Sequence, residues 1–344
     1  MAKNKKGEVA GQDPMEVAKK VGVPYIETEK VVDRLVPDMI MSCYRANPKD
    51  ERDERINERV KKALQDLFPN VMFEEIPTNV RSTFLVGPPG HGKTTAFREA
   101  AKKAAEAMGM EFVEELKDDI KIDENTYLFI SEEFSGETSK MGVGGIPGKR
   151  EEKLEDGTEV EYMIHLMPRR IAMLQKAGGG VFLLDDFTNA SKAVQNIGLS
   201  LSLEKRYQST DIGNSYVALT GNLGAIDGTN TSTASTALLN RLRMYFVQDN
   251  PENFIERGER KYKGSFGDLG ILGFLDGNEN YFTEFPSPRQ MGPFATPRSW
   301  DAFIESAISS AAVYGSAQEA VLKAKKEVDR DKEPETVDAT AEKT

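Results

Sequence analysis

The chain has 344 residues and a formal net charge of −11, with 39% hydrophobic and 29% charged residues. This composition is typical of a soluble globular protein, and no apolar run approaches the ~20 residues of a membrane-spanning helix. The acidic balance and the lack of a long basic run weigh against a protein that grips nucleic acid through its phosphates. One cysteine, Cys43, excludes an internal disulfide, and two histidines, His91 and His165, leave little material for a Cys/His metal site.

The two ends of the chain are polar. Residues 1–30 are weakly patterned and predict a flexible arm. The start of this arm is basic but lacks the apolar stretch of a signal peptide, so we expect a cytoplasmic protein. Apolar residues recur at three- and four-residue spacing in residues 31–75, which predicts a helical segment from about Thr28 to Leu67. Residues 323–344 are charged, with almost no large apolar side chains, and predict a disordered tail.

Residues 76–250 alternate short apolar segments with helical stretches. The apolar segments are rich in β-branched and aromatic residues, as strands are: Thr83–Val86, Thr126–Ile130, Val181–Leu184, Tyr216–Leu219 and Met244–Val247. This alternation predicts an α/β domain with a mostly parallel sheet covered by helices on both faces. An Asp-Gly pair within Lys153–Val160 predicts a β-hairpin that projects from the domain.

A phosphate-binding loop follows the first predicted strand. The sequence matches G-x-x-x-x-G-K-[ST] and precedes an Ala-rich helix. Its residues are Gly87, Pro88, Pro89, Gly90, His91, Gly92, Lys93, Thr94 and Thr95. The glycines let backbone N–H groups face a phosphate, and the helix N-terminus adds its dipole. We expect Lys93 to bind the β- and γ-phosphates of a nucleotide and Thr94 to ligate Mg²⁺.

Two carboxylates end the third predicted strand. Asp185 and Asp186 follow the apolar run that starts at Val181, at the edge where parallel sheets bind ligands. We expect Asp185 to be the magnesium partner and Asp186 to be the base that orients the attacking water. Asn222 ends the next predicted strand and is a candidate to position the same water.

Two arginines complete the candidate site. Arg241 precedes the last predicted strand, far along the sheet from its own phosphate loop, which suits an arginine finger that reaches a neighbouring subunit. Arg243 is a rival for this role. Arg298 lies in the first turn of a helix that Thr296 caps, where a cation opposes the helix dipole at a cost of about 0.3–1 kcal/mol. That cost suggests that Arg298 meets an anion, namely the bound nucleotide.

Taken together, these motifs resemble the AAA+ ATPases, and within them the MoxR branch, over roughly Pro77 to Gly315. Gly144-Gly145-Ile146-Pro147 is similar to a Gly-hydrophobic-Pro segment of the branch. The resemblance implies a five-stranded sheet (residues 76–250), a small helical lid (residues 251–322), a homo-oligomer that is usually a hexameric ring, and ATP and Mg²⁺ as ligands. It also implies remodelling or maturation of a client protein, often one with a von Willebrand A-type domain.

Two departures from the family keep other functions open. The family usually has Asp-Glu where this chain has Asp185-Asp186, and it often has an arginine where this chain has Asn189. The shorter Asp186 side chain supports a nucleotide-gated scaffold with weak hydrolysis as one alternative. A nucleic-acid motor or loader is the other, because it would share every residue of the ATP site. No residue discriminates ATP from GTP.

Overall fold

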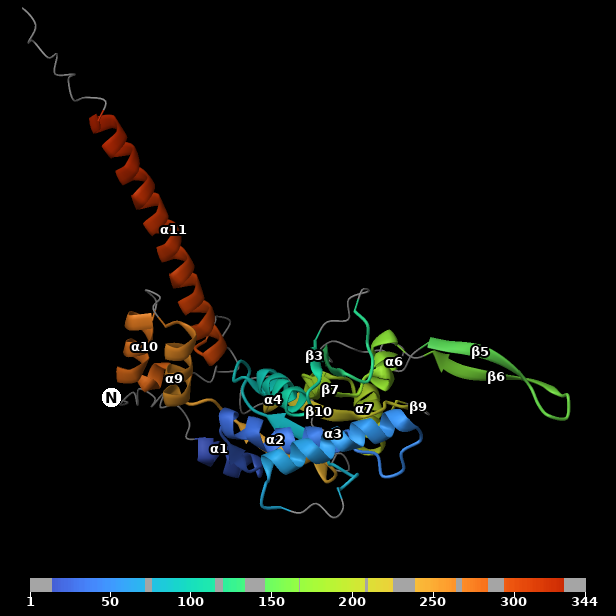
Figure 1. Ribbon diagram of the computed structural model, residues 1–344. Helices are drawn as coiled ribbons and strands as arrows, with labels where there is room; N and C mark the ends of the chain where they lie inside the picture. The colour runs from blue at the N-terminus through green and yellow to red at the C-terminus, as the bar shows by residue number, and fades with distance from the viewer. Residues whose placement is uncertain are drawn as a thin grey trace, which may run out of the picture.

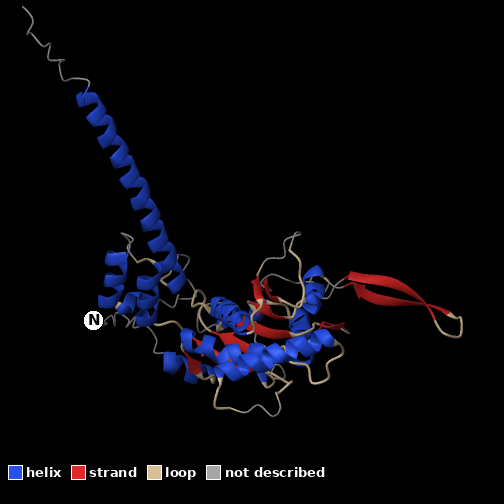
Figure 2. Cartoon of the chain, viewed as in Figure 1, coloured by secondary structure: helices blue, strands red, loops and turns tan. Residues whose placement is uncertain are grey.

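A parallel sheet between two layers of helices forms the body of the computed structural model (Figures 1 and 2). The structure describes residues 14–71, 76–114, 120–133, 146–166, 168–207, 210–224, 239–263, 268–283 and 294–330. Seven parallel strands lie in the order β1 (Tyr25–Ile26), β11 (Arg243–Val247), β2 (Thr83–Val86), β10 (Ser215–Gly221), β7 (Gly179–Asp185), β4 (Thr126–Glu133) and β3 (Glu111–Val113).

The observed sheet therefore has two strands more than the five that we expected. All five predicted strands are present and lie side by side as β11, β2, β10, β7 and β4. The sheet gains β1 at one edge and β3 at the other. These strands have only two and three residues, too few for an apolar pattern to stand out in the sequence.

Each face of the sheet packs against its own helices, because successive side chains of a strand point to opposite faces. On one face, Val181 and Leu183 join a core with α2 (Thr28–Ser42), α3 (Glu51–Leu67) and α4 (Lys93–Ala107). On the other face, Phe182 and Leu184 join a core with three further helices, α1 (Pro14–Val21), α6 (Arg169–Lys176) and α7 (Lys192–Glu204).

The N-terminal arm expected over residues 1–30 needs correction. Residues from Pro14 onward form α1 and β1, and Val17 is fully buried against the sheet. Pairing of β1 with β11 anchors this segment to the sheet. A contact with a distant strand leaves no mark on the local composition, so the polar sequence did not reveal it. Residues 1–13 lie outside the described part of the chain.

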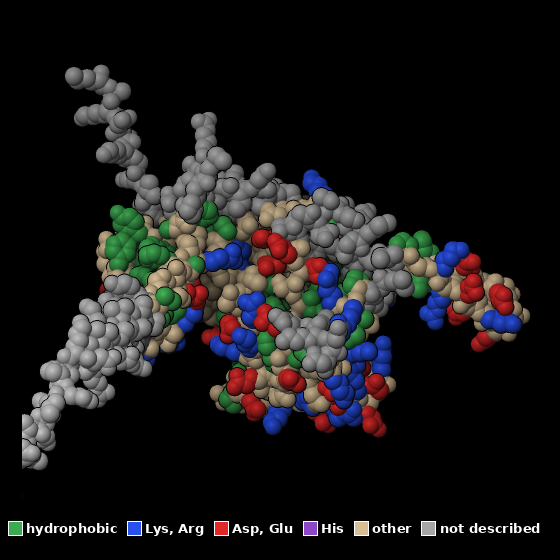
Figure 3. All heavy atoms as spheres, turned by 90° about the horizontal axis from the view of Figure 1, so that it is seen from above, with side chains coloured by type: hydrophobic (Ala, Val, Ile, Leu, Met, Phe, Trp, Pro, Cys, Tyr) green, Lys and Arg blue, Asp and Glu red, His purple; other side chains and the backbone are tan. Residues whose placement is uncertain are grey.

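The expected β-hairpin is confirmed. Strands β5 (Ile146–Lys153) and β6 (Glu159–Leu166) pair in antiparallel fashion, and the turn between them contains Gly157 at φ +87°. Figure 1 shows the hairpin projecting far from the body of the molecule. Its surface carries both acidic and basic side chains (Figure 3). Residues 134–145, which include the Gly144-Gly145 pair, lie outside the described part.

The C-terminal helices build a small core of their own. They are α9 (Pro251–Lys261), α10 (Asp268–Gly277), the short 3₁₀ helix η3 (Glu279–Tyr281) and α11 (Pro297–Arg330). Their buried side chains include Phe254, Leu272 and Ile304. The disordered tail expected from residue 323 needs correction as far as Arg330, because α11 continues to that residue (Figure 1). Residues 323–330 contain three Lys, one Ala, one Glu and one Arg, all good helix formers, and no Gly or Pro, which allows α11 to continue through them. Residues 331–344 lie outside the described part.

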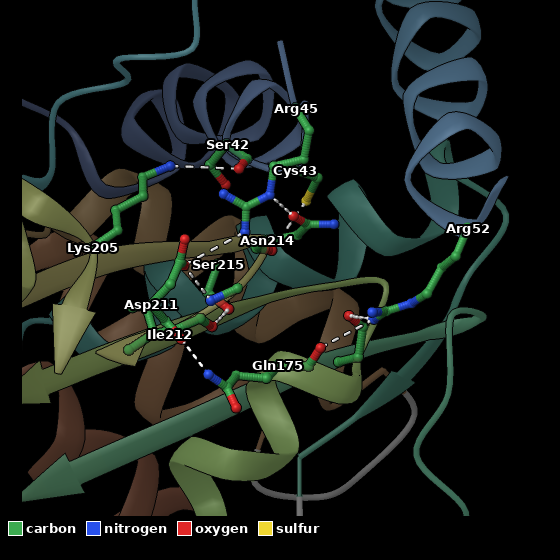
Figure 4. A network of polar contacts seen from close by, with 12 residues as sticks. Ser42, Cys43, Arg45, Arg52, Gln175, Lys205, Asp211, Ile212, Asn214 and Ser215 are labelled. Carbon is green, nitrogen blue, oxygen red and sulfur yellow. Dashed lines mark hydrogen bonds and ion pairs between the residues drawn. The ribbon is translucent and has the colours of Figure 1, made fainter. Parts of the chain in front are cut away.

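Polar contacts tie the layers together at the edge where the strands begin (Figure 4). Arg52 of α3 donates hydrogen bonds to three carbonyl oxygens at the end of α6, those of Gln175 (3.2 Å), Lys176 (2.7 Å) and Ala177 (2.7 Å). Arg45 donates a hydrogen bond to Asn214, just before β10. This amino-terminal edge is thus held by the ends of α2, α3 and α6. Within the described residues, no helix is long and apolar enough to span a membrane.

Candidate functional site

The phosphate-loop motif lies between β2 and α4, at the edge where the parallel strands end. Gly92 precedes α4 with φ +76°, a left-handed conformation that favours glycine. Gly87 lies against the end of β11, and a Cβ atom there would come within 2.1 Å of the Val247 carbonyl oxygen. The loop is therefore folded closely onto two strands, and α4 points its N-terminus toward the loop.

Lys93, the first residue of α4, is buried within the curl of the loop. Its Nζ donates hydrogen bonds to the carbonyl oxygens of Gly87 (2.8 Å) and Pro88 (2.8 Å) and to Oδ1 of Asn222 (3.1 Å). The bond to Asn222 joins the loop to the end of β10. Two residues selected independently from the sequence, Lys93 and Asn222, are thus in direct contact.

Thr94 and Asp185 also meet at this edge. Thr94 Oγ1 lies 3.0 and 3.1 Å from the two carboxylate oxygens of Asp185 and donates to them. The hydroxyl of Thr220, the residue before the last of β10, also donates to Asp185. A hydroxyl and a carboxylate are hard oxygen ligands of the kind Mg²⁺ prefers, so the donor set fits the expected ion.

Asp186 directly follows β7 in an unusual backbone conformation. Its φ of 51° is left-handed, which is uncommon outside glycine but tolerated by aspartate. Its Oδ1 accepts a hydrogen bond from Asn222 Nδ2 at 3.3 Å. The half-buried site raises the pKa of the Asp186 carboxyl above its ordinary value, mainly through desolvation and then through the negative charge of Asp185.

His91 is fully buried in the loop, and its imidazole contacts the chain between β11 and α9. Its Nδ1 accepts a hydrogen bond from the backbone N–H of Asp249 at 3.1 Å. The Asp249 carboxylate pairs with Arg257 of α9 at 2.6 Å. Burial, together with the charge of Lys93, lowers the pKa of His91 to about 3, so the ring is neutral at physiological pH.

Arg298, at the start of α11, lies beside the loop. A Cβ atom on Gly90 would come within 2.9 Å of Thr296 Oγ1 and 3.3 Å of Arg298 Cβ. Thr296 caps α11, because its Oγ1 accepts the N–H of Ser299 at 3.1 Å. The charge of Arg298 also reaches Asp186, whose pKa it lowers.

A cavity of about 600 Å³ opens next to the loop, between the sheet domain and the C-terminal helices. A volume of this size falls in the range of small-ligand sites. Residues of the loop, of α2, of α9 and of α11 line it, including Gly92, Thr95, Thr28, Asp249, Arg257 and Arg298. The cavity therefore borders the loop on the side of α2 and the C-terminal helices.

Arg241 lies outside this site, at the opposite edge of the sheet. Arg243 is in register with Thr83, the first residue of β2, whereas the loop follows the last residue of β2. At ~3.3 Å per strand residue, the start of β11, two residues after Arg241, is therefore about 13 Å from the loop. Its side chain is exposed. The rival Arg243 forms an ion pair with Asp38 of α2.

Thr188 and Thr220 belong to the site but were missed in the sequence. The backbone N–H of Asn222 donates to Thr188 Oγ1 (3.0 Å), and that of Asp186 donates to Thr220 Oγ1 (2.9 Å). Thr220 lies two residues before Asn222, so a search of the strand ends for hydroxyl groups would have found it. Its pairing with Asp185 follows only from the register of β10 and β7.

No protein-family model matches the chain, and no curated protein sequence matches it. Among solved structures, the S. cerevisiae Hsp104:casein complex in its extended conformation is similar, with 15% sequence identity and a TM-score of 0.42. The match covers 89% of this chain and 52% of the Hsp104 chain, so this chain spans about half the length of that neighbour. A likeness of this size identifies no family for the chain.

Proposed function

We propose that this protein binds Mg-ATP at the Gly87–Thr95 loop and hydrolyses it as an AAA+ ATPase. The observation that carries the proposal is the contact of Thr94 with Asp185 beside the buried Lys93. Three motifs that are distant in the sequence meet there, at the ends of the adjacent strands β2, β10 and β7. Ligands of parallel sheets bind at this edge.

Each residue has a role in this proposal. Loop N–H groups and the α4 N-terminus hold the phosphates, and Lys93 adds a positive charge to them. Thr94 and Asp185 would hold Mg²⁺, which neutralises charge on the phosphates when bound. Asp186, held by Asn222, accepts a proton from the attacking water as that water reaches the γ-phosphate. Arg298 stabilises the negative charge of the nucleotide from the side of α11.

We further propose a shared site in a homo-oligomer, with a hexameric ring as the family resemblance implies. The supporting observation is the position of Arg241, which is exposed at the edge of the sheet opposite its own loop. A guanidinium group there cannot serve its own nucleotide, but it can reach the nucleotide of an adjacent copy. The C-terminal helices would act as a lid over the cavity that they line.

The client in this proposal is a protein. The resemblance to the MoxR branch makes a protein with a von Willebrand A-type domain the candidate client. The projecting β5–β6 hairpin supports a protein client, because an isolated two-stranded hairpin is only marginally stable in water. It exposes Tyr162 and Met163, with 37% and 69% of their surfaces accessible. These side chains offer apolar area to a partner.

Steady-state ATP turnover against protein concentration tests this proposal. We expect specific activity to rise with concentration for the wild type and to be lost in Arg241→Ala. We expect a mixture of Arg241→Ala and Lys93→Ala to regain activity. In mixed oligomers the Lys93→Ala copy supplies Arg241 to the intact loop of an Arg241→Ala copy. Arg81→Ala is the matched control, because Arg81 is an exposed arginine at the same sheet edge. Activity that is independent of concentration, with no effect of Arg241→Ala, contradicts the shared site.

A nucleotide-gated scaffold with weak hydrolysis is the second candidate, and Asp186 favours it. The carboxylate is one methylene shorter than a glutamate, and a misplacement of about 1 Å can cost ~10²-fold in rate. This candidate requires two results: the wild type binds ATP with normal affinity, and Asp186→Asn leaves turnover unchanged. Turnover that rises steeply on addition of DNA would instead favour a nucleic-acid motor.

A further inference from the structure

The hydroxyl of Thr220 joins the two acidic residues that end β7. Thr220 is fully buried. Its Oγ1 donates a hydrogen bond to Asp185 Oδ1 and accepts one from the backbone N–H of Asp186 at 2.9 Å. A hydroxyl has a single proton, so donation to Asp185 leaves its lone pairs for the N–H of Asp186. The two bonds are compatible, and together they fix the direction of the hydroxyl.

The register of the sheet explains this contact. Leu219 of β10 pairs with Leu184 of β7, so the next residues, Thr220 and Asp185, lie side by side. Alternation along both strands turns these two side chains toward the face that α4 covers. Thr94 of α4 approaches Asp185 from that layer. The Asp185 carboxylate is therefore held between a hydroxyl from α4 and a hydroxyl from β10.

The same hydroxyl supports the unusual backbone of Asp186. A left-handed non-glycine residue persists only where its surroundings hold it, and such residues cluster at functional sites. Thr220 holds the N–H of Asp186, and Asn222 holds the side chain of Asp186 at 3.3 Å. This turn directs the Asp186 carboxylate toward Asn222 and the loop.

We propose that Thr220 is a positioning residue that orients both carboxylates for hydrolysis. It fixes Asp185 on the metal side of the nucleotide and fixes the turn that aims Asp186 at the attacking water. This role rests on the proposed ATPase function. It requires only the hydroxyl group, because the methyl group and the branched Cβ of threonine are shared by valine.

Removal of that hydroxyl in the full-length protein tests the role. In Thr220→Val we expect ATP affinity measured without Mg²⁺ to stay within about twofold of wild type. We expect kcat to fall about 10- to 100-fold and the Mg²⁺ concentration for half-maximal activity to rise. Thr220→Ser keeps the hydroxyl and restores most of the activity. Thr83→Val is the matched control, because Thr83 is a buried threonine of β2 that accepts a hydrogen bond from Tyr216 away from the site.

Three results overturn this role while leaving the ATPase proposal intact. The first is a turnover of Thr220→Val close to that of the wild type. The second is a turnover of Thr220→Ser as low as that of Thr220→Val. The third is a loss of turnover in Thr83→Val equal to that in Thr220→Val. A wild-type protein that neither binds nor hydrolyses ATP contradicts the proposed function itself, and the role of Thr220 with it.

Discussion

The imidazole of His91 accepts a hydrogen bond from the backbone N–H of Asp249, at 3.1 Å, inside the loop that we propose binds phosphate. Asp249 immediately precedes Asn250, the residue that caps α9. The loop is therefore linked to the point where the chain leaves the sheet and enters the C-terminal helices. A change in the loop on nucleotide binding can reach α9 through this contact.

The burial of His91 makes stability depend on pH. Burial lowers the pKa of His91 from 6.5 to about 3. Between these two pH values, His91 is neutral in the folded protein but protonated in the unfolded chain. The folded state therefore loses stability as pH falls below 6.5, by about 1.4 kcal/mol per unit down to the folded pKa. We expect His91→Asn, whose amide oxygen can accept the Asp249 N–H, to remove this loss.

Urea unfolding at several pH values between 4 and 8 measures this difference. The wild type and His91→Asn should have free energies of unfolding that run parallel above pH 7 and diverge below 6.5. Parallel curves over the whole range would show that His91 titrates normally and is not buried as the structure has it.

The raised pKa of Asp186 has a kinetic consequence. Asp186 must be ionised to act as a base, so turnover should rise with pH as its carboxyl loses a proton. Asp185 and Glu133 raise this pKa by their charges, while Lys93 and Arg298 lower it. We expect Glu133→Gln to move the acid limb of the kcat profile to lower pH. Asp186→Asn should abolish most of the rate. If the residual activity of Asp186→Asn keeps the same acid limb, the group that titrates there is not Asp186.

Arg298 should matter for both binding and turnover. Its position beside Gly90 and its electrostatic reach to Asp186 place Arg298 on the side of the cavity that faces the loop. We expect Arg298→Ala to weaken ATP binding by roughly tenfold, equivalent to about 1.4 kcal/mol. Arg298→Lys, which keeps the charge, should recover part of the affinity. Equal affinity in all three proteins, measured by calorimetry, would remove Arg298 from the site.

Arg52 is expected to contribute to stability and not to nucleotide binding. Its guanidinium satisfies three carbonyl oxygens where α6 ends, and a cation at that end also favours the helix dipole. Hydrogen bonds of charged groups contribute about 1.5–3 kcal/mol, so we expect Arg52→Ala to lower the free energy of unfolding by roughly that amount. Arg55→Ala, which breaks a more exposed pair with Glu124, should lower the free energy of unfolding much less than Arg52→Ala does.

The sequence located the parts of the candidate site that are contiguous. The loop at Gly87–Thr95 and the acidic pair after Val181 each follow an apolar run, so local pattern was enough to find them. Thr220 could not be paired with Asp185 because that contact depends on strand register. The edge strands β1 and β3 were missed because they are stabilised by pairing with longer strands and not by a pattern of their own. The C-terminal part of α11 was taken for a tail because its charged sequence has almost no large apolar residues.

Equilibrium binding of ATP, with Mg²⁺ present, tests the central claim most directly. The comparison is between the wild type, Lys93→Ala and the control Lys102→Ala, since Lys102 lies on the same helix but is exposed and pairs with Glu99 at 3.0 Å. We expect equal affinity for the wild type and Lys102→Ala, and a loss of at least about tenfold in Lys93→Ala. Undetectable binding by the wild type, or equal affinity in all three proteins, would contradict the claim that this loop binds the nucleotide.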